Sequence, residues 1–376
     1  MTPSSNYMTS LSIPKLRTIP VLLLAILFCL DLGWAQPINQ ISADSVDAIV
    51  RTHMTNKHIQ GVSIAIVRQG KVILAKGYGL ANVELNVPAT PQSVYAIASV
   101  SKQFLATGIL MLAQEGKLKL DDDIHKYYPQ APQTWQGITL RHLLSHTSGI
   151  VREAPAFDPA KIQPDSVVVQ SAFPLPLEFP IGTKWQYCNV GYFALADVIS
   201  KVSGQPWATF LKQRVFSPLG MTATRTTTLS EIVPNRVDGY EWDKDHLHRA
   251  IPYRALRPSG AFLSTVLDLA KWDAALYTSN YLTEASQKQM LTPFVLKDGT
   301  PYPYGLGWRV DTFQGTQWVH HGGSLPGFRT EYARFPQKGL SIIILTNGEE
   351  ASPETIAKEI ATLFLRSGAG KVASGK

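Results

Sequence analysis

The sequence predicts an α+β protein whose antiparallel sheet is formed by both ends of the mature chain. Strand-like apolar runs occur over 61–79 near the start and within 304–346 near the end, whereas the residues between them have helical periodicity and proline-rich loops. The economical arrangement is one antiparallel sheet flanked by terminal helices, with an inserted all-helical lobe. We expect a functional site in the cleft between the two lobes.

The expected elements follow in chain order. Apolar residues at helical spacing predict a helix over 42–57, and a hairpin over 61–79 turns at Gln69-Gly70. A helix over 99–115 carries an apolar stripe and ends at Gly116. The remaining expected elements are loops over 151–183, helices over 191–203, 207–216 and 353–366, and strands over 304–310, 316–321, 328–335 and 340–346.

Residues 1–35 have the organisation of a secretory signal peptide. Lys15 and Arg17 precede an apolar run over 19–30, and small residues stand before a cut after Ala35. The run is shorter than the roughly 20 residues that span a bilayer. We therefore expect an exported bacterial protein, periplasmic or secreted, with no stable membrane span after the signal is removed. A signal segment retained as a membrane anchor is the alternative.

The remaining chain divides into one domain and a short tail. The domain covers 36–367, with a sheet lobe over about 36–85 and 300–367 and a helical lobe over about 86–299. Residues 368–376 are rich in glycine, alanine, serine and lysine, which predicts a disordered tail.

Composition excludes several kinds of partner. The net charge is +7, but no dense basic run occurs in the mature chain, which argues against nucleic acid as a partner.

Only Cys188 follows the signal segment, so no internal disulfide forms, and we interpret this cysteine as a small buried filler. The histidine pairs 142/146 and 246/248 lack acidic or cysteine partners at familiar spacing, so we expect no metal and no cofactor. The oligomeric state stays open.

Ser99 and Lys102 form a Ser-x-x-Lys motif at the start of a predicted helix. Residues three apart on a helix share a face, so the hydroxyl and the amine can meet. A serine hydroxyl needs a base to become a nucleophile, and lysine can be that base if its pKa is lowered. The motif alone is weak, because Ser12 and Lys15 repeat it inside the signal segment. The alternative interpretation is a helix cap beside a solvated lysine.

Two later motifs favour chemistry. Tyr187 and Asn189 form a Tyr-x-Asn, and residues two apart in an extended segment face the same side. His321 and Gly323 form a His-x-Gly on a predicted strand, where glycine lets a substrate approach closely. His320-x-Gly322 fits the same pattern in the other register. The Gly-x-Ser-x-Gly elbow of other serine hydrolases is absent.

In this order, the three motifs resemble those of the serine β-lactamase and penicillin-recognising DD-peptidase superfamily. The sequence is most similar to its class C-like branch of esterases and D-peptidases. The resemblance covers most of residues 40–366 and implies the β-lactamase-like two-lobed fold. It includes the segments 95–104, 143–149, 189–192, 218–221, 263–265, 268–270, 304–308 and 326–328.

The resemblance implies a role for each site residue. Ser99 would attack the substrate, Lys102 would accept its proton, and Tyr187 would pass a proton to the leaving group and help to activate the deacylating water. Asn189 would hold Lys102 or the acyl side chain, and His321 would contribute polarity or positive charge. The backbone N–H groups of Ser99 and of Ser324, which follows Gly323, would form the oxyanion hole.

The third motif departs from that of many true β-lactamases, which have Lys-Thr-Gly or Lys-Ser-Gly there. Gly322 stands in place of the central hydroxyl residue. We therefore expect a hydrolase of small esters, amides or D-amino-acid peptides, either an esterase or a D-Ala-type peptidase. Protonation of His321 would then improve activity on carboxylate-bearing substrates as pH falls. A true β-lactamase and a non-catalytic penicillin- or peptidoglycan-binding protein are the alternatives.

Overall fold

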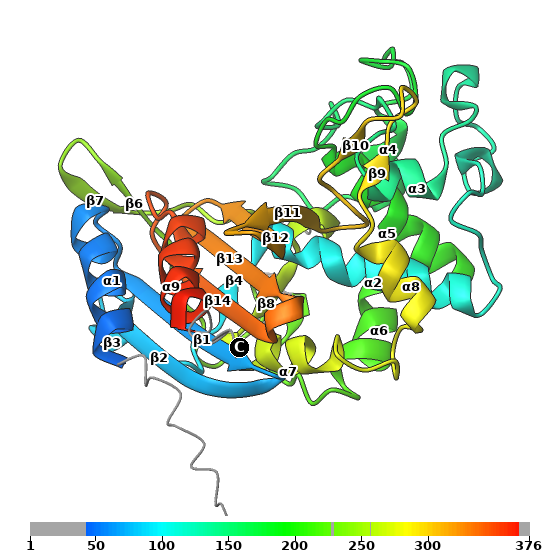
Figure 1. The fold of residues 1–376 in the computed structure, drawn as a ribbon. Helices are drawn as coiled ribbons and strands as arrows, with labels where there is room; N and C mark the ends of the chain where they lie inside the picture. The colour runs from blue at the N-terminus through cyan, green and yellow to red at the C-terminus, as the bar shows by residue number, and fades with distance from the viewer. Residues whose placement is uncertain (1–42, 227–228, 256, 368–376) are drawn as a thin grey trace, which may run out of the picture. The chain divides into compact units, whose positions relative to one another are not determined.

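The computed structural model describes residues 43–226, 229–255 and 257–367 (Figure 1). The expected signal segment over 1–35 and the expected tail over 368–376 lie outside these residues, so both stay predictions. No helix in the described ranges is long and apolar enough to cross a membrane. The described residues belong to a single compact unit, and the division into two lobes also stays a prediction.

The central sheet joins the two ends of the domain, as the sequence predicts for an α+β protein. Its seven strands run in the order β11-β12-β13-β14-β1-β2-β3, and all neighbours are antiparallel. In the β1–β14 pair, Ile64 lies opposite Ile344, so the first hairpin lies beside the last strand. The strands are β1 (Gly61–Arg68), β2 (Lys71–Asn82), β3 (Val87–Pro88), β11 (Arg309–Phe313), β12 (Thr316–Leu325), β13 (Phe328–Phe335) and β14 (Leu340–Thr346).

Both faces of this sheet are buried, which explains why its inner strands are continuous apolar runs. On β1, Ile64 and Ile66 pack with the helices α1 (Ala43–Asn56) and α9 (Pro353–Ser367), which cover one face (Figure 1). The alternate residues Ala65 and Val67 belong to the larger core on the other face. This is the period-2 pattern of a strand between two layers.

The larger core is built mainly by helices from the middle of the chain. Helix α2 is buried from Lys102 to Leu112 and packs against α5. A side chain at Gly108 would meet Ile199 at 2.9 Å, so glycine permits this close packing. The helices are α2 (Lys102–Gln114), α3 (Leu140–Leu144), α4 (Asp165–Gln170), α5 (Asn189–Ser203), α6 (Trp207–Leu211), α7 (Val266–Ala275) and α8 (Glu284–Met290).

Short strands and single helical turns complete the fold. The short strands are β4 (Tyr95–Ala96), β5 (Arg225–Thr226), β6 (Tyr240–Asp243), β7 (His246–Arg249), β8 (Phe262–Ser264), β9 (Phe294–Val295) and β10 (Pro301–Tyr302). Short 3-10 turns occur at Ala98–Ser101, Ile124–Lys126, Gln133–Trp135, Pro258–Gly260 and Pro336–Lys338, and a π turn at Lys212–Phe216.

Three expected elements differ from the structure. The strand expected over 304–310 is wrong, because β11 spans 309–313 and Gly307 adopts a left-handed φ of 77° that ends any strand there. The region 151–183 contains the short helix α4 as well as loops. The helix expected from Ser99 begins with a 3-10 turn and becomes α-helical only at Lys102.

Candidate active site

Ser99 lies in the 3-10 turn that leads directly into α2. Lys102 is the first residue of α2 and is fully buried, and its Nζ lies 3.2 Å from Ser99 Oγ. Ala98, immediately before the serine, has a left-handed φ of 48°. A non-glycine residue in this region is strained, and such strain is often found at functional sites. The two residues of the Ser-x-x-Lys motif are therefore brought together as the helical spacing predicts.

The contacts of Lys102 favour a neutral amine. Its Nζ donates to Asn189 Oδ1 at 3.0 Å and to the carbonyl of Ser259 at 2.9 Å. Burial, aided by the nearby positive charge of Arg257, holds the pKa of Lys102 well below its ordinary value. Because two acceptors take both N–H groups of a neutral amine, its lone pair is left for the hydroxyl of Ser99.

Tyr187 contacts both the nucleophile and the lysine. Its phenol is hydrogen-bonded with Ser99, and Lys102 Nζ lies 4.6 Å from the centre of its ring. Burial raises the pKa of Tyr187, so the side chain is a neutral phenol at physiological pH. A neutral phenol is able to donate a proton but is a poor base, which suits the expected transfer to a leaving group.

A polar network that sequence reasoning missed connects the two residues that accept hydrogen bonds from Lys102. Asn189 Nδ2 donates to Glu153 Oε1 at 2.6 Å, and the other oxygen of Glu153 is ion-paired with Arg257. Arg257 Nε in turn donates to Ser259 Oγ at 3.1 Å. The two residues that bind Lys102 are thus connected to each other. Neither Glu153 nor Arg257 belongs to a recognisable motif, so no sequence signal pointed to them.

A chain of hydrogen bonds joins the Tyr-x-Asn segment to the third motif. The backbone N–H of Cys188 donates to His146 Nδ1 at 3.0 Å, so the proton of this ring lies on Nε2, which is 3.2 Å from the Tyr304 hydroxyl. The carbonyl of Gly322 can only accept, so His321 Nδ1, at 2.7 Å, carries a proton. The Tyr304 hydroxyl then donates to His321 Nε2 at 3.0 Å. Each group in the chain has its partner only when both histidines are neutral.

These hydrogen bonds bear on the role expected for His321. Burial holds the pKa of His321 well below its ordinary value, which favours polarity over positive charge, the two contributions expected of this residue. The same cause lowers the pKa of His146. The gain in activity on carboxylate-bearing substrates at lower pH, expected from a protonated His321, is disfavoured by this environment and stays a prediction. His146 and Tyr304 belong to segments that carry the family resemblance, but their pairing was not predicted.

His320 has the opposite electrostatic environment. Its Nδ1 lies 2.9 Å from Glu331 Oε1 and its Nε2 lies 3.0 Å from Asp311 Oδ2, and its ring stacks on Trp318. Burial alone would lower the pKa of His320, but the hydrogen bonds to the two carboxylates outweigh it and raise the pKa. Neighbouring strand residues point to opposite faces. His320 therefore contacts two carboxylates, whereas His321 contacts the Tyr304 hydroxyl and the carbonyl of Gly322.

Acidic groups around His320 form the one metal-like cluster found in the described ranges. Potential ligand atoms of His320, Glu331 and Glu354 lie within 4.8 Å of one another. Each member already has a partner of opposite charge, because His320 faces Glu331 and Asp311 while Lys358 Nζ lies 2.7 Å from Glu354. The cluster is thus paired without an added cation.

Glycine at position 323 lets strand β12 approach the nucleophile turn. A Cβ there would lie 2.2 Å from Thr330 Oγ1 and 2.4 Å from the carbonyl of Ile97, distances that no side chain tolerates. The next residue, Ser324, consequently borders the same cavity as Ser99. This arrangement suits the expected pair of backbone donors to an oxyanion.

A single polar cavity of about 1170 Å³ unites the candidate residues. Cys188 is buried beside it, where burial raises the pKa of its thiol to about 12, and it serves as the expected filler. The cavity is lined by all three motifs and by four arginines: Ser99, Tyr187, Asn189, His321, Gly323 and Ser324, with Arg152, Arg257, Arg309 and Arg329.

Comparisons with known proteins show the family of this chain. Residues 46–365 match the family described as Beta-lactamase, so the chain belongs to the Beta-lactamase family, a family of serine hydrolases. Penicillin-binding protein 4* of Bacillus subtilis (strain 168) is 30% identical over 316 residues, which cover 78% of this chain and 69% of the relative. Protein flp of Staphylococcus aureus (strain N315) is 28% identical, and the match covers 81% of this chain but only 63% of the relative.

Solved structures show the same fold. The octameric penicillin-binding protein homologue from Pyrococcus abyssi has a TM-score of 0.78 at 27% identity, covering 87% of this chain and 78% of that one. The D-amino acid amidase from Ochrobactrum anthropi SV3, complexed with L-phenylalanine, has a TM-score of 0.76 at 21% identity and covers 87% and 99%. At this lower identity the likeness concerns the fold alone.

Proposed function

We propose that this protein hydrolyses small esters or amides through an acyl-enzyme on Ser99. The observation that carries the proposal is the buried amine of Lys102, which is held by two carbonyl oxygens with its third direction towards Ser99. A base of this kind activates a serine hydroxyl at neutral pH. A scaffold protein has no evident need for a buried lysine with a lowered pKa beside a cavity.

In the acylation step, Ser99 Oγ attacks the substrate carbonyl carbon and its proton moves to Lys102 Nζ. The N–H groups of Ser99 and Ser324 stabilise the negative charge that develops on the carbonyl oxygen. The bond to the leaving group then breaks, Tyr187 protonates that group, and the proton on Lys102 replaces the one that Tyr187 gave up. Water attacks the ester by the reverse sequence, which releases the acid and restores Ser99.

The second candidate substrate class is an amide or peptide that ends in a carboxylate. Arg309 lines the cavity, and its guanidinium lies 5.6 Å from the centre of the Trp185 ring. No carboxylate among the described residues forms an ion pair with Arg309, so its charge is available to a ligand. A true β-lactamase and a non-catalytic penicillin- or peptidoglycan-binding protein are the alternatives.

The test is to trap the acyl-enzyme by mass spectrometry. The mature protein is treated with p-nitrophenyl esters, a D-phenylalanine amide, a D-Ala-D-Ala peptide and nitrocefin, and the adduct is located by peptide mapping. We expect one adduct, on the peptide that contains Ser99, and its loss in both Ser99→Ala and Lys102→Ala, because members of one catalytic unit are not additive. An adduct on another serine would overturn the assignment, and no adduct with any probe would favour the binding protein.

A further inference from the structure

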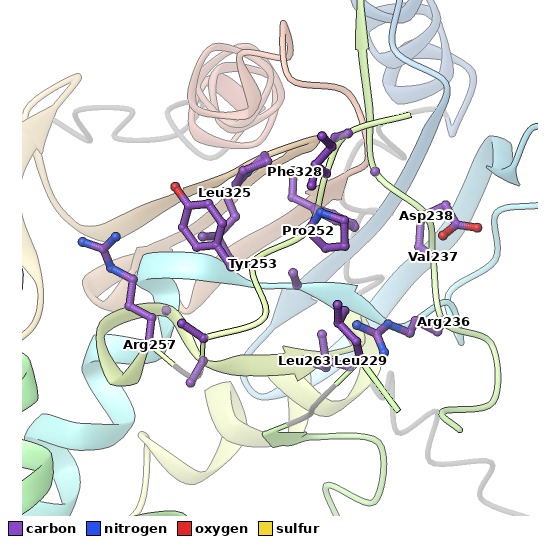
Figure 2. Close-up of a pocket in the computed structure, with 18 of the residues that line it drawn as sticks. Leu229, Arg236, Val237, Asp238, Pro252, Tyr253, Arg257, Leu263, Leu325 and Phe328 are labelled. Atoms are coloured by element: carbon purple, nitrogen blue, oxygen red, sulfur yellow. The ribbon is translucent and has the colours of Figure 1, made fainter. Parts of the chain in front are cut away.

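Figure 2 shows a second pocket, which adjoins the polar cavity that contains Ser99. It has a volume of about 580 Å³, which falls in the range of roughly 300–1,000 Å³ typical of small-molecule sites. Four residues line both spaces and therefore mark where they adjoin: Tyr253, Arg257, Gly260 and Leu325. The pocket thus adjoins the active-site cavity.

The walls of this pocket are mainly apolar. The apolar side chains come from β4, β8, the start of β13 and the segments 237–239 and 250–253; they include Ala96, Val237, Ala250, Pro252, Leu263 and Phe328. Charged groups lie at its two ends, with Arg257 towards one side of the view and Arg236 and Asp238 towards the other (Figure 2). Asp238 is neutralised by its ion pair with Arg249. Such walls favour a chain or ring of carbon atoms.

The position of the pocket relates it to the acyl group and not to the leaving group. Leu325 follows Ser324 directly, and Ala96 lies three residues before Ser99, so the segments that carry the two oxyanion donors continue into the pocket wall. Tyr187, which protonates the leaving group in the proposed mechanism, lines the polar cavity but not this pocket. In the proposed mechanism the leaving group therefore lies on the Tyr187 side of the reacting carbonyl, away from this pocket.

We propose that this pocket binds the apolar part of the acyl group, so that substrates with medium-length aliphatic or aromatic acyl groups are preferred to acetyl compounds. The inference rests on the proposed acyl-enzyme mechanism and specifies its substrate class. Burial of each added methylene group favours binding, and the benefit reaches kcat/KM because the chain stays buried in the transition state.

The experiment compares kcat/KM for p-nitrophenyl acetate, butyrate and octanoate. For the wild-type protein we expect the octanoate-to-acetate ratio to be at least ten. Ala250→Phe fills the pocket and should lower this ratio at least tenfold. Phe328→Ala enlarges the pocket and should move the optimum to a longer chain. Ile73→Phe, on an exposed position of β2 that does not line the pocket, is the matched control and should keep the wild-type ratio.

The outcomes distinguish a failure of the acyl pocket from a failure of the acyl-enzyme mechanism. A wild-type ratio near one, or a ratio that Ala250→Phe and Phe328→Ala both leave unchanged, would overturn the acyl pocket while acetate turnover upheld the mechanism. Absence of turnover and of acylation with every ester would instead reject the proposed function. If Ala250→Phe does not fold, the chain-length optimum of Phe328→Ala decides the question by itself.

Discussion

His146 holds Tyr187 through three contacts. Its carbonyl accepts the N–H of Gln186 at 2.9 Å, its Nδ1 accepts the N–H of Cys188 at 3.0 Å, and its ring lies 4.3 Å from the ring of Tyr187. The residues on either side of the tyrosine, and the tyrosine itself, therefore all contact one buried residue, two of them through its side chain. His146 also has a left-handed φ of 62°, which few residue types adopt.

The first prediction concerns the hydrogen bond from the N–H of Cys188 to His146 Nδ1, which substitutions of His146 test. Asparagine tolerates the left-handed backbone and offers an oxygen near the position of Nδ1, whereas alanine leaves the N–H of Cys188 unpaired. We expect His146→Ala to lower kcat by about tenfold to a hundredfold, since a misplaced proton donor loses most of its contribution, and His146→Asn to recover a large part. Steady-state kinetics on a p-nitrophenyl ester check this. Equal losses in both variants would show that the acceptor does not position Tyr187.

The second prediction concerns the pH dependence of kcat/KM. Because the amine of Lys102 acts as a base only when neutral, activity should fall as pH drops through its lowered pKa. His146 and His321 stay neutral in the folded protein, so their titration should not change kcat/KM between pH 6 and 8. The measurement is a pH–rate profile for a neutral ester. Activity that rises steadily up to about pH 10, the ordinary lysine pKa, would contradict a neutral Lys102.

The third prediction concerns the stability supplied by His320. Its pKa is raised in the folded protein, so the folded state binds more protons than the unfolded state between pH 6.5 and that raised value. Its contribution is therefore complete below the unfolded pKa and is lost as pH rises through the folded pKa. His320→Ala removes this dependence and leaves the carboxylate of Glu331 buried without a counter-charge, which costs about 3–5 kcal/mol.

Urea unfolding at pH 6 and pH 8.5 measures this effect. The wild-type protein should lose more stability over this interval than His320→Ala. His321→Ala is the matched control on the neighbouring position, and it should impair turnover more than it changes the pH dependence of stability. The opposite pattern would show that the two histidines had exchanged roles.

Glycine in the third motif gives the fourth prediction. In Gly323→Ala the new methyl group would overlap Thr330 and the carbonyl of Ile97, so β12 must move away from the nucleophile turn. Loss of one oxyanion donor costs about 2.7–4 kcal/mol of transition-state stabilisation, so kcat should fall by at least a hundredfold. Gly322→Ala is the control, since its methyl group would meet one side-chain oxygen of Glu331 at 3.0 Å and the carbonyl of Thr330 only at 3.6 Å, an ordinary contact distance. Similar kcat values for the two variants would refute the close approach of β12.

These residues show what the sequence could predict. Short-range relationships were accessible: Ser99 and Lys102 meet because a helical turn joins them, and the order of the three motifs indicated the family and its fold. The polar network around Lys102 was not accessible, because Glu153 and Arg257 are separated by 104 positions and meet only through tertiary folding. The protonation state of His321 depends on burial and on Tyr304, neither of which a motif records.

The last prediction concerns carboxylate recognition by Arg309. In the absence of a lysine in the third motif, Arg309 is a cation in the cavity that no described carboxylate neutralises. Arg309→Gln should raise KM for a peptide ending in D-Ala at least tenfold, because a hydrogen bond to a charged group contributes about 1.5–3 kcal/mol. The same peptide with an amidated C-terminus, and a neutral p-nitrophenyl ester, should be affected much less.

Arg309→Lys tests whether charge alone is sufficient. It keeps the positive charge but loses the two-pronged geometry that matches a carboxylate, so we expect partial recovery of KM. The measurement is kcat and KM for the acid and amide forms of one peptide in all three proteins. A KM that rises equally for both forms in Arg309→Gln would show that the arginine shapes the cavity, for example through Trp185, without binding the carboxylate.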